Sequence, residues 1–382
     1  MIDINNLIAQ LRQVEPQFLK DCCIVNGNVW PLNQIENMSL EEYAARTIYS
    51  LPMKFYKYFP NVEKEEKDDA GNKRFRNYST MALESNEVFL SSPSAFDDVF
   101  DSEIYVSWEE FETFRIKTFA RWSKCCFDEN MSTEEIANIF LGHLNGIIQT
   151  DKDLETAFDM EGYGELEKLQ AQGAILRLKI EITKNHLGVA LRNIIIQEYD
   201  AFIKELQLKF RVACFTTTPV SQLMWGASYA NEHKGFCLEY TVTLDKEYEE
   251  IIHNIRPVVY CKTRRPVTQA ILNAYNKNWD LSALRDLYLN GVLRKSIDWA
   301  YQNEWRLLLP PQEHGQSGFT KKFFPITKVY LGNRMPPKRR KEIIDICKRK
   351  GIPYVGVIRS PDLFEMQECN ILCENCLRYN SN

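Results

Sequence analysis

The triplet Glu304, Trp305 and Arg306 combines a carboxylate, a large aromatic ring and a guanidinium in a segment that favours a β-strand. Successive side chains of a strand alternate between its two faces, so Glu304 and Arg306 share one face and Trp305 takes the other. A carboxylate and a guanidinium on one face either line a cleft and do chemistry there or form a structural ion pair. Both interpretations stay open at this point.

A second group of side chains, Trp225, Tyr229 and His233, recurs at intervals of four residues. If a helix spans them, all three lie on one face and form an aromatic surface that ends in an imidazole. Such a surface suits a flat ligand such as a nicotinamide or a base. Packing of the same side chains in the core is the alternative.

A cluster of acids, Asp97, Asp98, Asp101 and Glu103, belongs to the run SSPSAFDDVFDSE. Clustered carboxylates bind hard cations such as Mg²⁺, which would suit a metal-dependent nuclease. The spacing is not that of an EF-hand and lacks its glycine. Capping of a loop or of the following helix is the alternative role.

Three cysteines near the C-terminus, Cys369, Cys373 and Cys376, have the C-x3-C-x2-C spacing of a cluster-binding loop. No glycine-rich barrel pattern precedes them, and no Cys or His nearby in the sequence completes a tetrahedral zinc site. We therefore expect no metal. The other eight cysteines have apolar or aromatic neighbours, and we interpret all of them as free thiols that fill the core.

Composition places the chain among ordinary globular proteins. Its 382 residues include 47 Lys and Arg against 52 Asp and Glu, and the net charge of -5 argues against a surface that clamps nucleic acid or anionic lipid as a whole. No apolar run has the length of a signal peptide or a membrane span, so we expect a cytoplasmic protein without a membrane partner. Phosphate-loop, Rossmann, zincin and serine-hydrolase motifs are absent from the sequence.

Hydrophobic periodicity divides the chain. Between residues 108 and 210 apolar side chains recur every three or four positions, which is typical of helices, and Ser132 with Glu135 forms a capping box. On either side the period is close to two, and turn residues separate the runs, as in strands. We therefore predict an α+β fold in which a mixed β-sheet core is split by a large helical insertion.

The same pattern sets the expected boundaries. They are a helical N-terminal lead-in (1–52), the first part of the α+β core (53–107), the helical insertion (108–210), the second part of the core (211–360) and a Cys-containing tail (361–382). The strands after residue 210 are expected to form one sheet. The charged segment NVEKEEKDDAGNKR is expected to be a solvated loop.

Several separated motifs, in order, resemble a bacterial family catalogued as domain of unknown function 2971. The family's Y-K-Y strand, its S-S-P-S-x-F-N-D-P-F-D loop, and its C-F-S, M-W-x-x-Y-x-x-x-H-x-G-F and E-x-E-W-R motifs are matched by residues 56–58, 91–101, 214–216, 224–236 and 304–306. The resemblance extends from about Phe55 to Val357, interrupted by the helical block.

The chain departs from the family pattern at four positions. Phe59 stands where the family often has Arg, Asp97 replaces Asn, Val99 replaces Pro, and Gln302 stands where the first acid of E-x-E falls. Loss of the Arg and of that acid removes groups that a transferase uses.

The order of strand, helix, serine-ended strand, aromatic run and late Glu is similar to the layout of ADP-ribosyltransferases. This resemblance implies NAD as substrate. It implies that Glu304 stabilises the ribosyl cation, that Tyr229 or Trp225 stacks on the nicotinamide, and that His233 holds a ribose hydroxyl. The residues implied in binding NAD are Lys57, Tyr58, Ser91, Ser92, Trp225 and Arg306, with Lys57 and Arg306 neutralising the pyrophosphate.

Three functions stay open from the sequence. The first is NAD-dependent ADP-ribosyl transfer or NAD cleavage, with a protein or nucleic-acid acceptor left open. The second is a non-catalytic effector or regulatory module, for instance in defence or as a toxin, that binds a nucleotide or a partner; Phe59 and Gln302 favour it. The third is a metal-dependent nuclease built on the acidic cluster.

Overall fold

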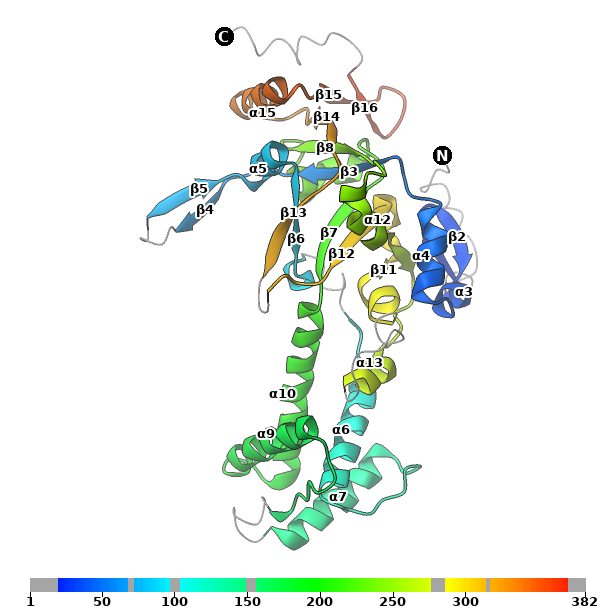
Figure 1. The fold of residues 1–382 in the computed structure, drawn as a ribbon, viewed down its shortest axis with the longest axis vertical. Helices are drawn as coiled ribbons and strands as arrows, with labels where there is room; N and C mark the ends of the chain where they lie inside the picture. The colour runs from blue at the N-terminus through cyan, green and yellow to red at the C-terminus, as the bar shows by residue number, and fades with distance from the viewer. Residues whose placement is uncertain are drawn as a thin grey trace. The chain divides into compact units, whose positions relative to one another are not determined.

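The computed structural model describes residues 20–67, 72–96, 104–148, 156–275, 286–313 and 317–369 (Figure 1). The chain divides into two compact units. The first contains the described parts of Met1–Ser102, Leu208–Thr263 and Leu293–Asn382, and the second contains those of Glu103–Gln207 and Arg264–Val292. Among the described residues all strands belong to the first unit, and the predicted α+β class is confirmed.

The first unit contains strands and short helices. Its strands are β1 (Cys22–Val25), β2 (Asn28–Pro31), β3 (Lys54–Phe59), β4 (Lys64–Lys67), β5 (Lys73–Arg76), β6 (Glu87–Ser91), β7 (Arg211–Thr216), β8 (Phe236–Thr241), β9 (Ile255–Pro257), β10 (Val259–Cys261), β11 (Arg294–Ser296), β12 (Glu304–Leu309), β13 (Gly318–Lys322), β14 (Ile326–Leu331), β15 (Tyr354–Arg359) and β16 (Met366–Glu368). Its helices are α3 (Leu32–Glu36), α4 (Leu40–Ile48), α5 (Tyr78–Ser85), α11 (Gln222–Gly226), α12 (Glu249–Asn254) and α15 (Pro337–Lys350), with 3-10 helices η1 (Pro93–Ala95), η2 (Ser228–Ala230), η3 (Lys246–Tyr248) and η5 (Ile297–Gln302).

These strands form a mixed ten-stranded sheet and a smaller four-stranded one. The large sheet has the order β13-β6-β7-β3-β8-β14-β15-β16, with β12 paired to β7 and β9 to β12. The small sheet has the order β11-β10-β1-β2. The prediction of a single sheet for the strands after residue 210 is therefore wrong, because β10 pairs with β1 from the N-terminal segment.

The N-terminal segment is not purely helical, as the lead-in prediction had it. Strands β1 and β2 form a hairpin closed by Asn26 and Gly27, which both have positive φ values of 48° and 75°. An Asn-Gly pair between apolar runs favours a tight hairpin turn because both residues tolerate left-handed backbone. The turn signal therefore outweighed the helical periodicity.

The charged segment between β3 and α5 also differs from its prediction. It contains the hairpin β4–β5, in which the Lys73 ammonium lies 2.9 Å from a Glu65 carboxylate oxygen. Glu66 also lies opposite Arg74, so opposite charges link the two strands, although the pairs Lys64–Arg76 and Lys67–Lys73 carry like charges.

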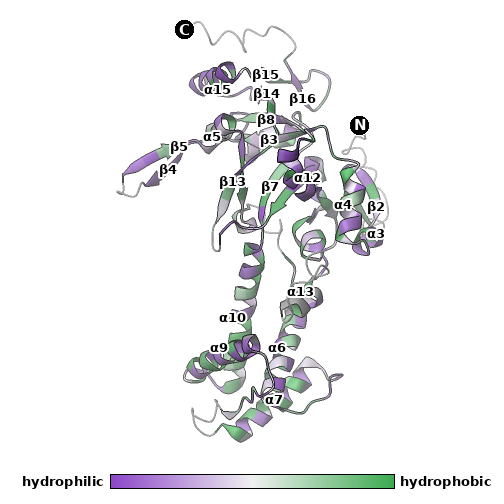
Figure 2. Ribbon diagram, viewed as in Figure 1, coloured by the Kyte–Doolittle hydropathy of each residue, from purple (hydrophilic) through white to green (hydrophobic). Residues whose placement is uncertain are grey.

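The core of the large sheet is aromatic. Phe215 stacks on Phe323 with 4.2 Å between ring centroids, and Phe55 packs edge-on against Trp305 at 5.6 Å. Figure 2 shows hydrophobic residues along β7. Trp305 faces this core, as the strand alternation predicted.

The second unit is helical in its described residues. Its helices are α6 (Trp108–Trp122), α7 (Thr133–Ile147), α9 (Glu165–Ile182), α10 (Leu187–Leu208), α13 (Thr268–Tyr275) and a π-helix, η4 (Asp286–Val292). The predicted capping box of Ser132 and Glu135 begins α7. Residues 264–292, which the periodicity assigned to the core, belong to this unit.

Candidate functional site

Strand β7 has partners on both edges, and one edge is divided. Strand β12 pairs with β7 along its whole length. On the opposite edge β6 pairs at Val212 and β3 pairs at Thr216. Between these two points the Cys214 carbonyl accepts a hydrogen bond from the Lys57 ammonium at 2.9 Å. The sheet is therefore split here between β6 and β3.

A cavity of about 570 Å³ lies at this split, within the ~300–1,000 Å³ typical of small-molecule sites. Seven of its nineteen lining residues are aromatic. The aromatic side chains are Tyr56, Tyr58, Phe89, Phe96, Phe215, Tyr229 and Trp299. The charged side chains of the wall are Lys57, Lys295 and Glu304. The cavity thus combines flat apolar surfaces with a few charged groups.

The Glu304 carboxylate is held by two cations. Its Oε1 accepts a hydrogen bond from Arg306 Nε at 2.7 Å, and its Oε2 accepts one from Lys295 Nζ at 2.8 Å. All three side chains are buried. Burial alone raises the pKa of Glu304, but the Arg306 guanidinium and the Lys295 ammonium outweigh it and hold that pKa well below its ordinary value. Glu304 is therefore an ionised carboxylate in the cavity wall.

A hydrogen-bonded chain links this carboxylate to Tyr229. Lys295 Nζ also donates to Gln302 Oε1 at 2.9 Å, and Gln302 Nε2 donates to the Tyr229 hydroxyl at 2.8 Å. Burial raises the pKa of Tyr229 to about 12, so the phenol is neutral at pH 7. The Tyr229 oxygen accepts from Gln302, and its own O–H remains a donor.

Lys57 lies on the other side of the split. Its ammonium is 5.3 Å from the Phe215 ring centroid, and burial lowers its pKa. An ammonium has three donors, and the Cys214 carbonyl uses one. The remaining donors are available to an anionic ligand.

Five of the nine residues proposed from the sequence line this cavity: Lys57, Tyr58, Ser91, Tyr229 and Glu304. The Tyr58 hydroxyl donates to the Thr218 carbonyl at 3.1 Å, so its ring contributes surface rather than a free polar group.

Trp225 and His233 do not line the cavity, and the predicted helical surface is not formed. Helix α11 ends at Gly226, and Asn231, Glu232 and His233 have positive φ values, which an α-helix does not accommodate. Trp225 is fully buried, and its indole N–H donates to the Pro219 carbonyl at 2.7 Å. The His233 ring is stacked against Trp225, with 6.3 Å between centroids.

Arg306 and Ser92 are buried and also do not line the cavity. Arg306 is fully buried and forms an ion pair with Glu304, which lines the cavity. The prediction that Glu304 and Arg306 share one face of a strand is confirmed by this contact.

The acidic cluster, Asp97, Asp98, Asp101 and Glu103, lies outside the described residues, as do Cys373 and Cys376. In the part of the chain that is described, no group of three or more His, Cys, Asp and Glu is placed to hold a metal ion. Cys126 is exposed, so the interpretation of all eight other cysteines as core residues is wrong for it. None of the described helices is both long enough and apolar enough to cross a membrane.

Sequence reasoning missed Lys295, Trp299 and Gln302 as site residues. Lys295 lies in β11 and Gln302 is the last residue of the 3-10 helix η5, so Lys295 reaches Glu304 and Gln302, and Gln302 reaches Tyr229. A lysine in the short polar stretch between Leu293 and Ile297 was the available signal, because a lysine that apolar flanks draw into the core needs a partner for its ammonium.

Comparison with known proteins agrees with the motif resemblance. Residues 224–307 match the model of the family described as Protein of unknown function (DUF2971), which confirms the resemblance to domain of unknown function 2971. The matched segment includes Tyr229, Lys295, Gln302 and Glu304. No curated protein and no solved structure matches the chain.

Proposed function

We propose that the cavity of the first unit binds a nucleotide of the NAD class and that Glu304 promotes cleavage of its nicotinamide–ribose bond. The observation that carries this proposal is the ionised Glu304 carboxylate in the wall of an aromatic cavity. A fixed negative charge stabilises a ribosyl cation as it develops, and it needs no reorganisation to do so.

The charge of the cavity supports a ligand with a diphosphate. Lys57 and Lys295 line it, Arg306 lies behind it, and Glu304 supplies the opposing charge. Three cations against one carboxylate attract an anion. We assign the diphosphate to Lys57, whose ammonium has donors left, and the nicotinamide ring to Tyr229.

The proposed reaction breaks the bond between the nicotinamide nitrogen and ribose C1′. The bonding electron pair leaves with nicotinamide, which becomes neutral, and C1′ forms a bond to the oxygen of water or of an acceptor hydroxyl. That oxygen loses its proton to solvent. The depressed pKa of Glu304 makes it a weak base, so its role is electrostatic and not proton abstraction.

Binding without cleavage is the second candidate, and one observation favours it. Both Glu304 oxygens already accept hydrogen bonds from cations, which reduces the field that a ribosyl cation experiences. In this case the chain is a nucleotide-binding effector or regulatory module.

Calorimetric titration with NAD, followed by measurement of nicotinamide release, separates these candidates. We expect NAD binding, and we expect Glu304→Gln to lower the release rate by about 10²–10³-fold. Binding with no release by the wild type supports the second candidate. Absence of NAD binding contradicts both.

The matched control is Glu239→Gln. Glu239 is a buried carboxylate outside the cavity wall that accepts hydrogen bonds from Tyr56, Thr327 and Tyr330. Its amide should leave nicotinamide release close to that of the wild type. Lys57→Met provides a test that leaves Glu304 intact, and we expect it to weaken NAD binding by about tenfold through loss of a charge-assisted contact.

A further inference from the structure

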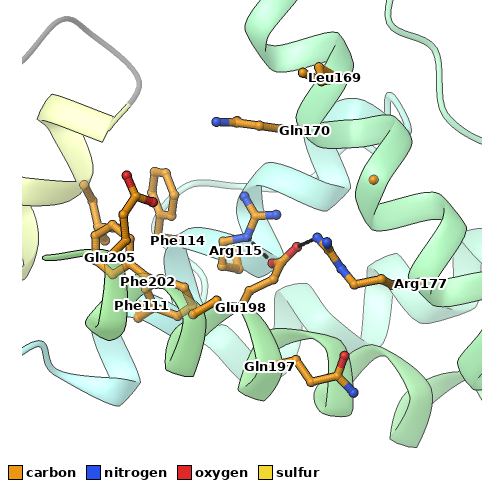
Figure 3. A pocket seen from close by; sticks show the side chains of 13 residues that line it. Phe111, Phe114, Arg115, Leu169, Gln170, Arg177, Gln197, Glu198, Phe202 and Glu205 are labelled. Atoms are coloured by element: carbon orange, nitrogen blue, oxygen red, sulfur yellow. Dashed lines mark hydrogen bonds and ion pairs between the residues drawn. The ribbon is translucent and has the colours of Figure 1, made fainter. Parts of the chain in front are cut away.

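A second cavity, of about 420 Å³, lies within the helical unit (Figure 3). Helices α6, α9 and α10 provide most of its wall. Its apolar surface includes Phe111, Phe114 and Phe202, and the two small residues Gly173 and Ala201 leave room between α9 and α10. None of these residues belongs to the unit that contains Glu304.

Arg115 is the unusual residue in this wall, because it is only 7% exposed. Its Nε donates to Glu198 Oε2 at 2.8 Å, and its guanidinium carbon lies 4.8 Å from the Phe119 ring centroid. Within the described ranges, its two terminal amino groups have no hydrogen-bond partner. Figure 3 shows these groups directed away from Glu198, toward the side of the cavity where Gln170 lies.

The local charges leave a positive excess beside these donors. Glu198 Oε1 accepts a second hydrogen bond from Arg177 at 2.6 Å, so one carboxylate faces two guanidiniums. The other acid of the wall, Glu205, is exposed, and Figure 3 shows it beside Phe114. The terminal amino groups of Arg115 are not among the fully buried donors without a partner, so water in the cavity reaches them, and an anion could replace that water.

We propose that this cavity binds a small carboxylic acid with an apolar body. Its carboxylate would accept two parallel hydrogen bonds from the terminal amino groups of Arg115, the geometry in which a guanidinium fork matches a planar oxyanion. The apolar body would pack against Phe111, Phe114 and Phe202. A monoanion matches the guanidinium of Arg115, whose terminal amino groups Glu198 does not use, and the volume suits on the order of a dozen non-hydrogen atoms at ~30 Å³ for each water-sized group.

Titration calorimetry of the full chain with 4-phenylbutyrate, octanoate and the neutral 4-phenylbutyramide tests the proposal. We expect both acids to bind and the amide to bind about 10–100-fold more weakly, because it lacks the charge-assisted hydrogen bonds. Failure of both acids to bind overturns the proposal, as does equal binding of the phenylbutyrate and its amide.

A variant that fills the cavity tests the location without removing the arginine. A Cβ at Gly173 would have as its nearest neighbour only Arg177 Nη1, at 3.8 Å, so Gly173→Leu fits in α9 and also raises helix propensity. Gly142→Leu is the matched control, because Gly142 lies in α7 with no atom within 4 Å of its Cβ position. We expect Gly173→Leu to abolish 4-phenylbutyrate binding and Gly142→Leu to retain it. Equal binding by the two variants contradicts the assigned site.

Discussion

Glu304 in the first unit and Glu198 in the second unit have the same local arrangement. Each is a carboxylate in a cavity wall, and each accepts hydrogen bonds from two cationic side chains, one on each oxygen. They differ in burial. Arg306 and Lys295 are both buried beside Glu304, whereas Arg177 is 44% exposed beside Glu198.

This difference decides what each carboxylate does. Lys295 and Arg306 are both buried beside Glu304, and the Glu304 carboxylate balances their positive charge. Its negative charge therefore contributes to the stability of the fold. Beside Glu198, Arg177 reaches water, and the excess charge falls on Arg115, whose terminal amino groups face the cavity. The first arrangement presents a carboxylate to a ligand, and the second presents a guanidinium.

The largest effect is expected from Glu304→Gln. Removing one charge of a buried ion pair leaves its partners uncompensated, which costs about 3–5 kcal/mol in the free energy of unfolding. Urea unfolding at pH 7 measures this loss. A loss no greater than that of a surface pair, about 1 kcal/mol or less, would show that the two arrangements do not differ in the way inferred.

Acid unfolding provides a control on the same residue. Because the folded-state pKa of Glu304 is depressed, its charge stabilises the fold above the unfolded-state pKa of about 4.3. That contribution is lost as the pH falls toward the folded-state pKa. The wild type should therefore lose more stability than Glu304→Gln between pH 5 and about pH 3. Parallel pH dependences of the two proteins would contradict the assigned shift.

A smaller effect is expected from Glu198→Gln. Arg177 can be hydrated when its partner is lost, and only Arg115 remains buried without a counter-charge. We expect a destabilisation of about 1–3 kcal/mol, smaller than that of Glu304→Gln. Urea unfolding of both variants under the same conditions compares their losses in the free energy of unfolding. A loss equal to that at Glu304 would mean that burial is not the deciding difference.

Tyr229→Phe tests the hydrogen-bonded series that runs from Glu304 through Lys295 and Gln302 to Tyr229. The change removes the acceptor of Gln302 Nε2 and leaves the amide donor of a buried residue without it. We expect a loss of about 1 kcal/mol in the free energy of unfolding. Thermal unfolding of the variant beside Tyr49→Phe, which removes an exposed phenol, controls for loss of any hydroxyl. Equal melting temperatures of Tyr229→Phe and the wild type would show that the hydrogen bond between Gln302 and Tyr229 does not stabilise the fold.

The smallest effect is expected from Gly173→Ala in the second cavity. The added methyl group meets no backbone atom, and alanine is the better helix former, so stability should rise by about 0.5–1 kcal/mol. Gly142→Ala should give a similar gain from the same cause. Urea unfolding of both variants compares them, and a decrease at Gly173 alone would show that the cavity wall is more tightly packed than inferred.

Much of the fold follows from local sequence patterns. The strands expected at residues 56–58 and 304–306 appear as β3 and β12, and the predicted capping box begins α7. These elements depend on interactions between residues a few positions apart, which the sequence displays directly. The match to DUF2971 over residues 224–307 likewise confirms a resemblance that the motifs carried.

Local patterns failed where a turn or a charge pairing outweighed periodicity. Asn26 and Gly27 close a hairpin in a segment that was predicted to be helical. The run from Trp225 to His233 has helical spacing, yet Asn231 begins three residues of left-handed backbone. Spacing alone does not say where a helix ends.

The sequence by itself determined the α+β class, the strand that carries Glu304 and Arg306, and the direction of Trp305 into the core. Only the tertiary structure decided that Lys295 and Gln302 join Glu304, that β7 has a divided edge, and that Arg115 meets Glu198 across 83 positions of the chain. The physical reason is that strand alternation and helix capping depend on neighbours in sequence. A cavity and its charge depend on which distant side chains are buried together.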